Sequence, residues 1–272
     1  NSLAMKNLRD PKREFAGVRA FGTIGWIAVA WAFPMIWLQS NLDFQWLPPF
    51  FKGEPRPDQL ARMVDSVKFA GILSMVFGVY CWMFLPHTPP RRDGVQKLAL
   101  VSAFALMKRK SFAVFLVAAY LVSSVHFIYF MQTSKFLAAR GLPGEYLMPA
   151  MSIGQFAEIA AMALLGKMLV RFGFRATVIV GAGCYALRYV IFGTPGMPLG
   201  LLVASQAIHG LCFACFYAAG FIYVDRISPP DVRSSAQAIV MLVLFGLGQL
   251  SAGTLNGFLS RMLSVDGVLA YT

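Results

Sequence analysis

Three polar side chains, Ser152, Gln155 and Glu158, lie at intervals of three within the apolar stretch "MPAMSIGQFAEIAAMALLG", residues 148–166. On a helix this spacing puts them on one face, where an amide can hydrogen-bond a solute and a carboxyl can take up and release a proton. A carboxyl in such surroundings faces protein or water and is commonly functional. The alternative is that Glu158 neutralises a buried arginine, for which Arg188 is the candidate.

A second polar stripe lies in "VRAFGTIGWIAVAW", where Arg19, Thr23 and Trp26 are spaced i, i+4 and i+7 and so share a helical face. We expect Gly22 and Gly25 to let another helix approach closely. Arg19 could bind a solute or could extend to the cytoplasmic headgroups. Trp26 lies deeper, where the role of interfacial anchor suits it less, so it is a candidate binding residue.

Aromatic and hydrogen-bonding side chains crowd two later segments. In "SSVHFIYFMQTSKFL" they are His126, Phe127, Tyr129, Phe130, Gln132 and Thr133, and in "SQAIHGLCFACFYAAGFIYVD" they are His209, Phe213 and Tyr217, four apart. Such stripes usually make core or lipid contacts. A binding site is favoured here because amides, a carboxyl and flat rings recur on several helices. The three histidines lack the spacing of metal ligands, so we expect no metal and no cofactor.

The composition decides what surrounds these groups. With 58% hydrophobic and 13% charged residues, the chain of 272 residues has more apolar surface than one soluble core can hide. Seven runs approach the roughly 20 residues that a membrane-crossing helix needs. They are 18–38, 69–85, 112–131, 147–170, 176–192, 199–224 and 236–259. Because they lack strict alternation, they exclude a barrel, and we predict an all-α polytopic membrane protein with seven transmembrane helices.

The formal net charge of +12 would suggest a nucleic-acid partner in a soluble protein. Here the basic residues concentrate in alternate connections: before the first predicted helix, then between the second and third, the fourth and fifth, and the sixth and seventh. By the positive-inside rule the N-terminal segment and these connections are cytoplasmic. The distribution of the basic residues therefore indicates how the chain is oriented in a cell membrane. We expect the lipid bilayer, not a nucleic acid, as the partner.

The sequences of two connections and one cysteine pair lead to further predictions. The Pro-rich connection 39–67 reads as an extracytoplasmic loop with a short interfacial helix carrying Trp46 and Phe50. The connection 86–111 contains "VQKLALVSAFALMKRK", an amphipathic basic segment expected to lie on an anionic membrane surface. Cys212 and Cys215 form a CxxC, but apolar surroundings without a basic neighbour favour packing over redox chemistry.

Five motifs resemble the nucleoside:proton symporter family of the major facilitator superfamily. In chain order they are "VRAFGTIGWI", "MSIGQFAEI", "LRYVIFG", "IHGLCFACFYAAGFIYVD" and "VRSSAQA", and they cover almost the whole chain. The resemblance implies nucleoside-binding roles for Arg19, Thr23, Gln155, Glu158 and Phe213. It also places Trp26 at a pocket position that relatives fill with an aromatic residue.

The chain departs from that family at three positions. Characterised members carry a glutamine and an asparagine where this sequence has Phe127 and Phe130, and an aspartate where it has Ala214. Loss of these polar groups bears on the identity of the solute. His126, Tyr129 or Gln132 are candidates to compensate, and we include His126, Phe127, Tyr129 and Phe130 among the expected binding residues.

The resemblance implies a twelve-helix fold, of which the seven predicted helices correspond to the fifth through eleventh. We expect a fragment that lacks the first four helices and the last one, and that does not transport alone. Residues 1–90 would hold the last two helices of the N-terminal bundle, 91–111 a cytoplasmic linker, and 112–272 most of the C-terminal bundle. Asp225, Arg226 and Arg233 could lock the inward side by salt bridges, or could serve topology and solvation.

These expectations combine into proton-coupled nucleoside uptake by alternating access, with two bundles rocking around a midplane site and Glu158 coupling proton to solute. We expect a monomer in the bacterial inner membrane, with a nucleoside or similar small polar solute and protons as its partners. The alternative is a major facilitator carrier for a sugar or another small polar metabolite. An enzyme or an ATP-driven pump is not expected, because GxSxG, HExxH and GxxxxGK[ST] do not occur.

Overall fold

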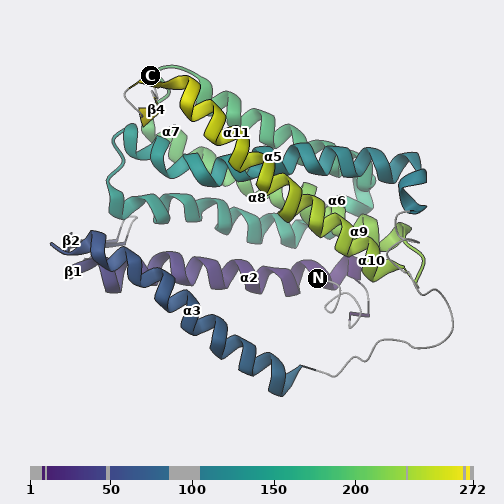
Figure 1. Ribbon diagram of the computed structural model, residues 1–272, viewed down its shortest axis with the longest axis horizontal. Helices are drawn as coiled ribbons and strands as arrows, with labels where there is room; N and C mark the ends of the chain where they lie inside the picture. Colours follow the sequence, from purple (N-terminus) through teal and green to yellow (C-terminus); the bar gives the residue numbers. More distant parts are fainter. Residues whose placement is uncertain are drawn as a thin grey trace. The chain divides into compact units, whose positions relative to one another are not determined.

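The computed structural model describes residues 8–9, 11–46, 50–85, 105–230, 232–265 and 268–269. Its α-helices are α2 (Pro11–Phe33), α3 (Gln59–Phe84), α5 (Lys110–Ala139), α6 (Gly144–Gly193), α7 (Leu199–Ala204), α8 (Ile208–Cys212), α9 (Ala219–Ile227), α10 (Arg233–Met241) and α11 (Gly248–Leu263). Single turns of other helix types are η1 (Pro34–Leu38), η2 (Ala105–Lys108), η3 (Ser205–Ala207), η4 (Phe213–Ala218) and η5 (Leu242–Leu247). Short strands are β1 (Gln39–Phe44), β2 (Phe51–Pro55), β3 (Ser264–Val265) and β4 (Val268–Leu269). The predicted all-α architecture is confirmed (Figure 1).

Six helical stretches of the described residues are long and apolar enough to cross a membrane. They are Gly17–Leu38, Val64–Phe84, Lys110–Ala139, Tyr146–Gly193, Leu199–Ile227 and Arg233–Met262. The predicted count of seven is therefore wrong by one, because the predicted helices 147–170 and 176–192 are joined within α6.

Helix α6 is nevertheless interrupted at Gly173, whose φ of 74° and ψ of 172° are not helical. At about 1.5 Å per residue, its apolar stretch of 48 residues would be about 72 Å long if straight, more than twice the hydrocarbon thickness of a bilayer. The glycine divides α6 into a first arm, residues 144–172, and a second arm, residues 174–193. Glycine adopts this positive φ without strain, so one residue suffices to interrupt the helix.

The chain forms two compact units. The first comprises Asn1–Ile27 with Leu98–Thr272, and the second comprises Ala28–Lys97. The start of α2 thus groups with the later helices. The assignment of residues to an N-terminal and a C-terminal bundle stays a prediction.

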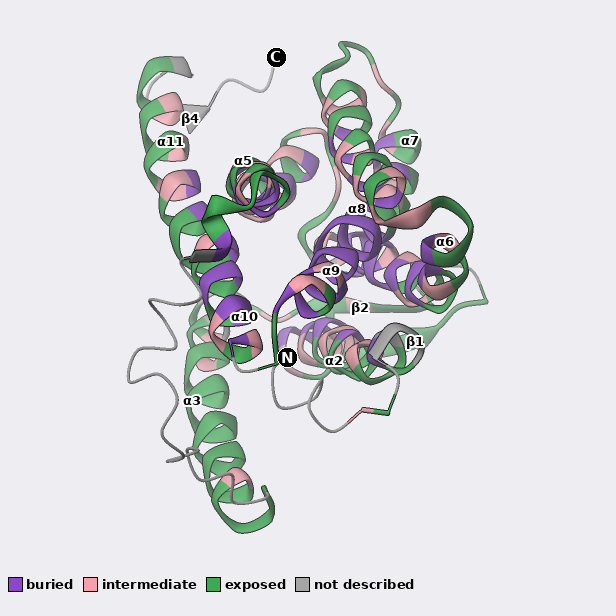
Figure 2. Cartoon of the chain, turned by 90° about the vertical axis from the view of Figure 1, so that its right-hand side faces the viewer, coloured by how far each residue is buried: buried purple, intermediate pink, exposed green. Residues whose placement is uncertain are grey.

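The stretch Leu199–Ile227, made of α7, η3, α8, η4 and α9, is the centre of the first unit. Every residue from 213 to 219 is buried, as the purple ribbon around α8 shows in Figure 2. Close approach to α6 depends on glycine: a Cβ on Gly181 would lie 2.7 Å from the backbone nitrogen of Phe216. A Cβ on Gly210 would meet the backbone of Ala157 and Glu158. Cys212 and Cys215 are buried free thiols within this centre.

Helix α5 packs along α11 within the first unit. The Ser123 hydroxyl donates to the carbonyl of Leu244, and the Gln132 amide donates to the Asn256 side chain. The outward faces are apolar: Val170, Val190 and Leu250 are among the large exposed hydrophobic residues. Such faces are typical of helices in contact with lipid.

The second unit contains an antiparallel β1–β2 hairpin, in which Gln39 pairs with Pro55 and Phe44 with Phe51. The predicted interfacial helix in this connection is therefore wrong: Trp46 and Phe50 lie outside any helix and are exposed. The Pro48–Pro49 sequence is a physical reason, because proline removes backbone donors and disfavours helical conformation in the preceding residue. Phe44 makes an edge contact with Phe51 across the hairpin, with ring centroids 5.5 Å apart.

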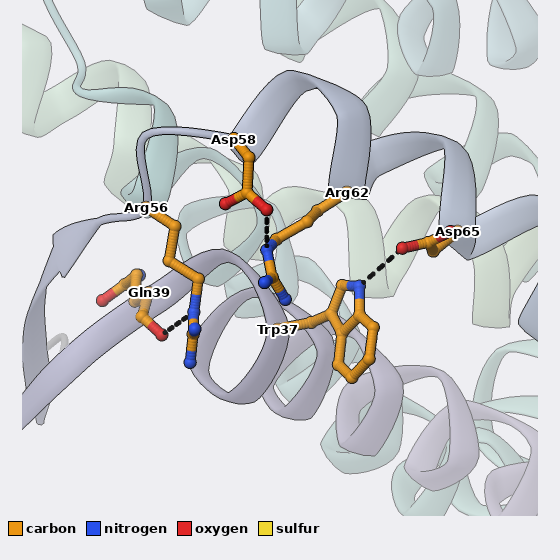
Figure 3. A network of polar contacts seen from close by, with 6 residues as sticks. All are labelled: Trp37, Gln39, Arg56, Asp58, Arg62 and Asp65. Carbon is orange, nitrogen blue, oxygen red and sulfur yellow. Dashed lines mark hydrogen bonds and ion pairs between the residues drawn. The ribbon is translucent and has the colours of Figure 1, made fainter.

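A polar network holds the start of α3 to η1 within this unit (Figure 3). The Trp37 indole donates to Asp65 Oδ2 at 3.1 Å, and the Arg62 guanidinium lies 5.3 Å above the Trp37 ring. Arg62 Nε donates to Asp58 Oδ2 at 2.8 Å, and this hydrogen bond lowers the pKa of the Asp58 carboxyl. Because Asp58 is exposed, the pair contributes little to stability.

The basic connection after α3 lies mostly outside the described residues. Of the predicted amphipathic segment 95–110, the structure describes the turn η2 and the two residues that follow it. The basic residues Arg91, Arg92 and Lys97, and the acidic Asp231, also lie outside the described residues.

Candidate functional site

The carboxyl of Glu158, on the first arm of α6, is buried and accepts a hydrogen bond from α2. Thr23 Oγ1 donates to Glu158 Oε1 at 2.7 Å, and both residues are only 2% exposed. Among the ion pairs of the described residues, none involves Glu158. The alternative in which Glu158 neutralises Arg188 is thus not what the structure contains, since Arg188 instead contacts His209 on α8.

A cavity of about 150 Å³ lies beside this hydrogen bond. Four helical elements line it: α2 with Arg19, Gly22, Thr23 and Trp26, α5 with His126 and Phe130, α6 with Gln155 and Glu158, and the α8–η4 segment with His209 and Phe213. Eight of the ten predicted binding residues therefore meet at one place. All of them belong to the first unit.

Arg19 turns into this cavity. Its guanidinium carbon lies 4.8 Å from the centroid of the Phe213 ring, a cation–π arrangement between α2 and η4. The same guanidinium lies over Gly22, where an added Cβ would be 2.9 Å from Arg19 Nη1. Gly22 thus makes room for Arg19 itself, not for another helix, and Gly25 has nothing within 4 Å among the described residues.

Aromatic rings form one wall of the cavity. The His126 ring is stacked on His209 with centroids 5.5 Å apart, and it meets Phe130 at 5.0 Å. Phe213 is stacked on Tyr217 at 5.2 Å with an interplanar angle of 6°. The cavity is therefore lined by flat rings as well as by the polar side chains of α2 and α6.

Two predicted binding residues, Phe127 and Tyr129, do not line the cavity. Phe127 meets Phe245 at 6.1 Å, and Tyr129 is 3% exposed with its hydroxyl donating to Gln206 Oε1 at 2.5 Å. Phe127 follows the lining residue His126, and Tyr129 precedes the lining residue Phe130. Because one step along a helix turns a side chain by about 100°, both point away from the cavity. Ser152 of the predicted stripe is also absent from the lining, and it donates to the carbonyl of Pro149.

His209 belongs to the aromatic stripe noted in the sequence but was not among the ten predicted binding residues, and it lines the cavity. The available signal was its position four residues before Phe213, which places both on one helical face. Gly22 also lines the cavity without having been a predicted binding residue.

The predicted gating residues lie near one end of the first unit. Asp225 Oδ1 is 3.5 Å from Arg233 Nε, which joins α9 to α10. Arg226 forms no such pair in the described residues, and its guanidinium lies 5.7 Å from the Phe174 ring. Arg109 Nη1 donates to the carbonyl of Ile227 at 3.1 Å, so basic residues from two connections, 86–111 and the one between α9 and α10, gather at this end.

Comparison with known proteins adds a decisive observation: the sequence pattern of the nucleoside H+ symporter family matches residues 1–272, the whole chain. The chain belongs to this family. Its predicted membership is thereby confirmed. In the Escherichia coli K12 proteome, the putative nucleoside transporter YegT is 29% identical over 265 residues, which cover 94% of this chain and 58% of YegT.

Other relatives agree. The xanthosine permease of the same organism is 26% identical, and the nucleoside permease NupG is 25% identical. Each alignment covers 95% of this chain and 60% of the relative. The chain thus spans about three-fifths of the length of the curated relatives it matches.

Solved structures show a shared fold. The crystal structure of an aspartate-to-alanine mutant of the nucleoside transporter NupG matches with a TM-score of 0.72 and 23% identity, over 99% of this chain and 65% of that one. The crystal structure of NupG itself matches with a TM-score of 0.66 and 24% identity, over 96% of this chain and 63% of that one. These matches confirm that the chain shares the fold of NupG over almost all of its length.

Proposed function

We propose that the protein containing this chain takes up nucleosides together with protons by alternating access. The observation that carries this proposal is the cavity in which a buried carboxyl, an amide, a guanidinium and stacked rings converge from four helical elements. A nucleoside has hydroxyl groups on its sugar and a flat base, and the lining offers groups complementary to both. Membership of the nucleoside H+ symporter family supports the same solute.

Each lining group has a role in this proposal. Gln155 and Glu158 hydrogen-bond the ribose or the base edge, while Phe213 and Trp26 stack on the base. Stacking of a base on an aromatic ring contributes roughly 1 to 3 kcal/mol in nucleic-acid binders. Arg19, held over Phe213, keeps a cationic donor beside the base.

The cavity must widen to admit such a solute. Its volume of about 150 Å³ is below the roughly 300 Å³ at which ordinary ligand pockets begin. In the predicted bundle assignment, α2 belongs to one bundle and α6 to the other. Rocking of the bundles would separate Thr23 from Glu158, breaking the hydrogen bond that joins them here.

Glu158 couples the proton to the solute in this scheme. When Thr23 no longer donates to Glu158, a proton on one carboxyl oxygen gives the side chain an O–H donor, while the other oxygen can still accept a hydrogen bond from a solute hydroxyl. Proton and solute can then be bound at the same time and favour each other's binding, which is the requirement for symport. Opening and closing of the cytoplasmic side would involve Asp225, Arg226 and Arg233.

The location is part of the proposal. The protein acts as a monomer that crosses the bacterial inner membrane several times, with its N-terminal segment in the cytoplasm. The proposed orientation is supported by three basic residues that lie at one end of the first unit, Arg109, Arg226 and Arg233. Basic residues favour the cytoplasmic side of a membrane.

A Glu158→Gln variant of the full-length protein tests the coupling role. Glutamine preserves size and hydrogen bonding but cannot release a proton. We expect loss of proton-driven nucleoside accumulation in proteoliposomes, with exchange of internal for external nucleoside retained. Glu14→Gln, which alters an exposed carboxyl on α2, is the matched control and should accumulate normally. Unimpaired accumulation by Glu158→Gln would refute the coupling role.

The alternative solute, a sugar or another small polar metabolite, is tested by competition. Phe130, Phe213 and the histidine rings in the lining favour a solute with a flat face over a monosaccharide. We therefore expect purine or pyrimidine nucleosides, but not monosaccharides in equal excess, to inhibit uptake of a labelled nucleoside. Inhibition by monosaccharides alone would favour the alternative.

A further inference from the structure

Arg188 is a buried cation in the second arm of α6 that the transport scheme above does not use. Its side chain is fully buried, and its Nη1 lies 2.9 Å from Nδ1 of His209. Its guanidinium carbon is 3.7 Å from the centroid of the Tyr129 ring. Nε and Nη2 have no hydrogen-bond partner among the described residues. Among the described residues, the guanidinium of Arg188 therefore forms its hydrogen bond with His209.

The chemistry of arginine decides the state of that histidine. A guanidinium has five N–H donors, no acceptor, and does not lose its proton in proteins. Nδ1 of His209 must then be the acceptor, because a proton on it would face an N–H of Arg188 directly. A ring with an unprotonated Nδ1 is neutral and carries its proton on Nε2.

Packing fixes the orientation of the same ring. Tyr129 is stacked on His209 at 5.3 Å with an interplanar angle of 19°, and Phe130 meets it edge-on at 5.5 Å. Gly154 of α6 leaves room beside it, since an added Cβ would be 2.9 Å from the Cβ of His209. With Nδ1 occupied by Arg188, Nε2 is the ring nitrogen left to serve the cavity that His209 lines.

We propose that Arg188 is a positioning residue that holds His209 in its neutral Nε2–H form, so that the cavity offers a fixed donor to an acceptor atom on the base. The inference rests on the proposed nucleoside transport. It names the recognised feature of the solute: a carbonyl oxygen or an unprotonated ring nitrogen on the edge of the base. Solutes that replace this acceptor by C–H lose the hydrogen bond.

His126 provides an internal contrast. Its Nδ1 lies 2.6 Å from the hydroxyl of Tyr185, and a hydroxyl can either donate or accept. The Tyr185 contact therefore does not dictate which nitrogen of His126 carries a proton. A method that reports the protonation of each ring nitrogen should find a single fixed form at His209, whatever it finds at His126.

Solid-state ¹⁵N nuclear magnetic resonance of the full-length protein in lipid tests the tautomer. With ¹⁵N-labelled histidine, and with the His209 signals assigned by their loss in His209→Phe, we expect an unprotonated Nδ1 and a protonated Nε2. Arg188→Lys retains a donor without an acceptor and should keep this form, whereas Arg188→Gln can accept as well as donate and should give a mixture. Tyr185→Phe is the control and should leave the His209 signals unchanged.

A protonated Nδ1 or an imidazolium at His209 in the wild-type protein would overturn the proposal. This wild-type measurement stands even if an Arg188 variant does not fold. It also does not depend on the solute, so it separates failure of this inference from failure of the proposed function.

Binding measurements test the recognised feature. Nucleosides would be compared with analogues that replace one acceptor by C–H, deaza analogues for each ring nitrogen and deoxo analogues for each base carbonyl, in the wild-type and the His209→Phe full-length proteins. We expect one such replacement to weaken binding to the wild-type protein about tenfold, as for a lost hydrogen bond, and to have no effect in His209→Phe. Equal discrimination by both proteins would overturn the role in specificity. Absence of any nucleoside binding by the wild-type protein would instead contradict the proposed function.

Discussion

The hydrogen bond from Thr23 to Glu158 joins residues 135 positions apart in the chain. Thr23→Val removes the hydroxyl while keeping a branched side chain, so the cavity loses a hydroxyl that can bind the solute once it is released from Glu158. Leaving a partner atom on the bound solute unpaired costs about 1–3 kcal/mol. We expect about tenfold weaker nucleoside binding by the full-length protein, measured by isothermal titration calorimetry.

Thr23→Ser is the matched control because it keeps the hydroxyl and deletes only the methyl group. Its affinity should stay close to that of the wild-type protein. If serine weakened binding as far as valine does, packing of the methyl group would be responsible, and the hydrogen bond would not carry the effect.

At the scale of residues, helical periodicity accounts for most of the site. The i, i+4 and i+7 spacing of Arg19, Thr23 and Trp26 correctly placed these residues on one face, and all three line the cavity. The dense aromatic segment of α5 was harder. There, consecutive residues point in different directions, so Phe130 reaches the cavity while Tyr129 contacts Gln206 instead.

At the scale of elements, the contact between α8 and α6 depends on Gly210. A Cβ at this position would meet the backbone of Ala157 and Glu158, which cannot rotate away as a side chain can. Gly210→Ala should therefore push α8 from α6 beside the site and destabilise the protein by about 1–3 kcal/mol. The check is the thermal unfolding midpoint of the full-length protein in detergent, which we expect to fall.

Gly183→Ala, on the second arm of α6, is the control. Nothing lies within 4 Å of a Cβ added there, and alanine favours a helix over glycine by about 1 kcal/mol. Its midpoint should be unchanged or slightly higher. A Gly210→Ala protein as stable as Gly183→Ala would show that the close contact does not support the fold.

The errors at this scale have local causes. Apolar runs identify membrane-crossing segments, but they do not reveal that α6 continues up to and beyond the single non-helical residue Gly173. The sequence analysis missed the β1–β2 hairpin. Its strands pair residues from two separate segments, as in Phe44 with Phe51. Helical or alternating patterns are read within one segment, so they do not reveal such pairing.

At the scale of the whole molecule, orientation in the membrane can be measured directly. In a cysteine-free full-length protein we would introduce Lys108→Cys, close to the basic end, or Pro195→Cys, in the connection between α6 and α7 that carries no basic residue. Because basic residues favour the cytoplasmic side, a membrane-impermeant maleimide should label Pro195→Cys in intact cells and Lys108→Cys only after permeabilisation. The reverse pattern would invert the proposed topology.

The amino-acid sequence alone determined the membrane class, the all-α architecture, the family and two polar faces, those of α2 and the first arm of α6. These follow from composition and short periodic patterns, because a helix in lipid must satisfy its backbone internally and any polar side chain within it stands out. Tertiary structure alone decided that Thr23 bonds Glu158, that His209 lines the cavity, and that Arg188 bonds His209 and not Glu158. Such contacts depend on how each helix is rotated against its neighbours, which close packing of side chains sets and local spacing does not encode.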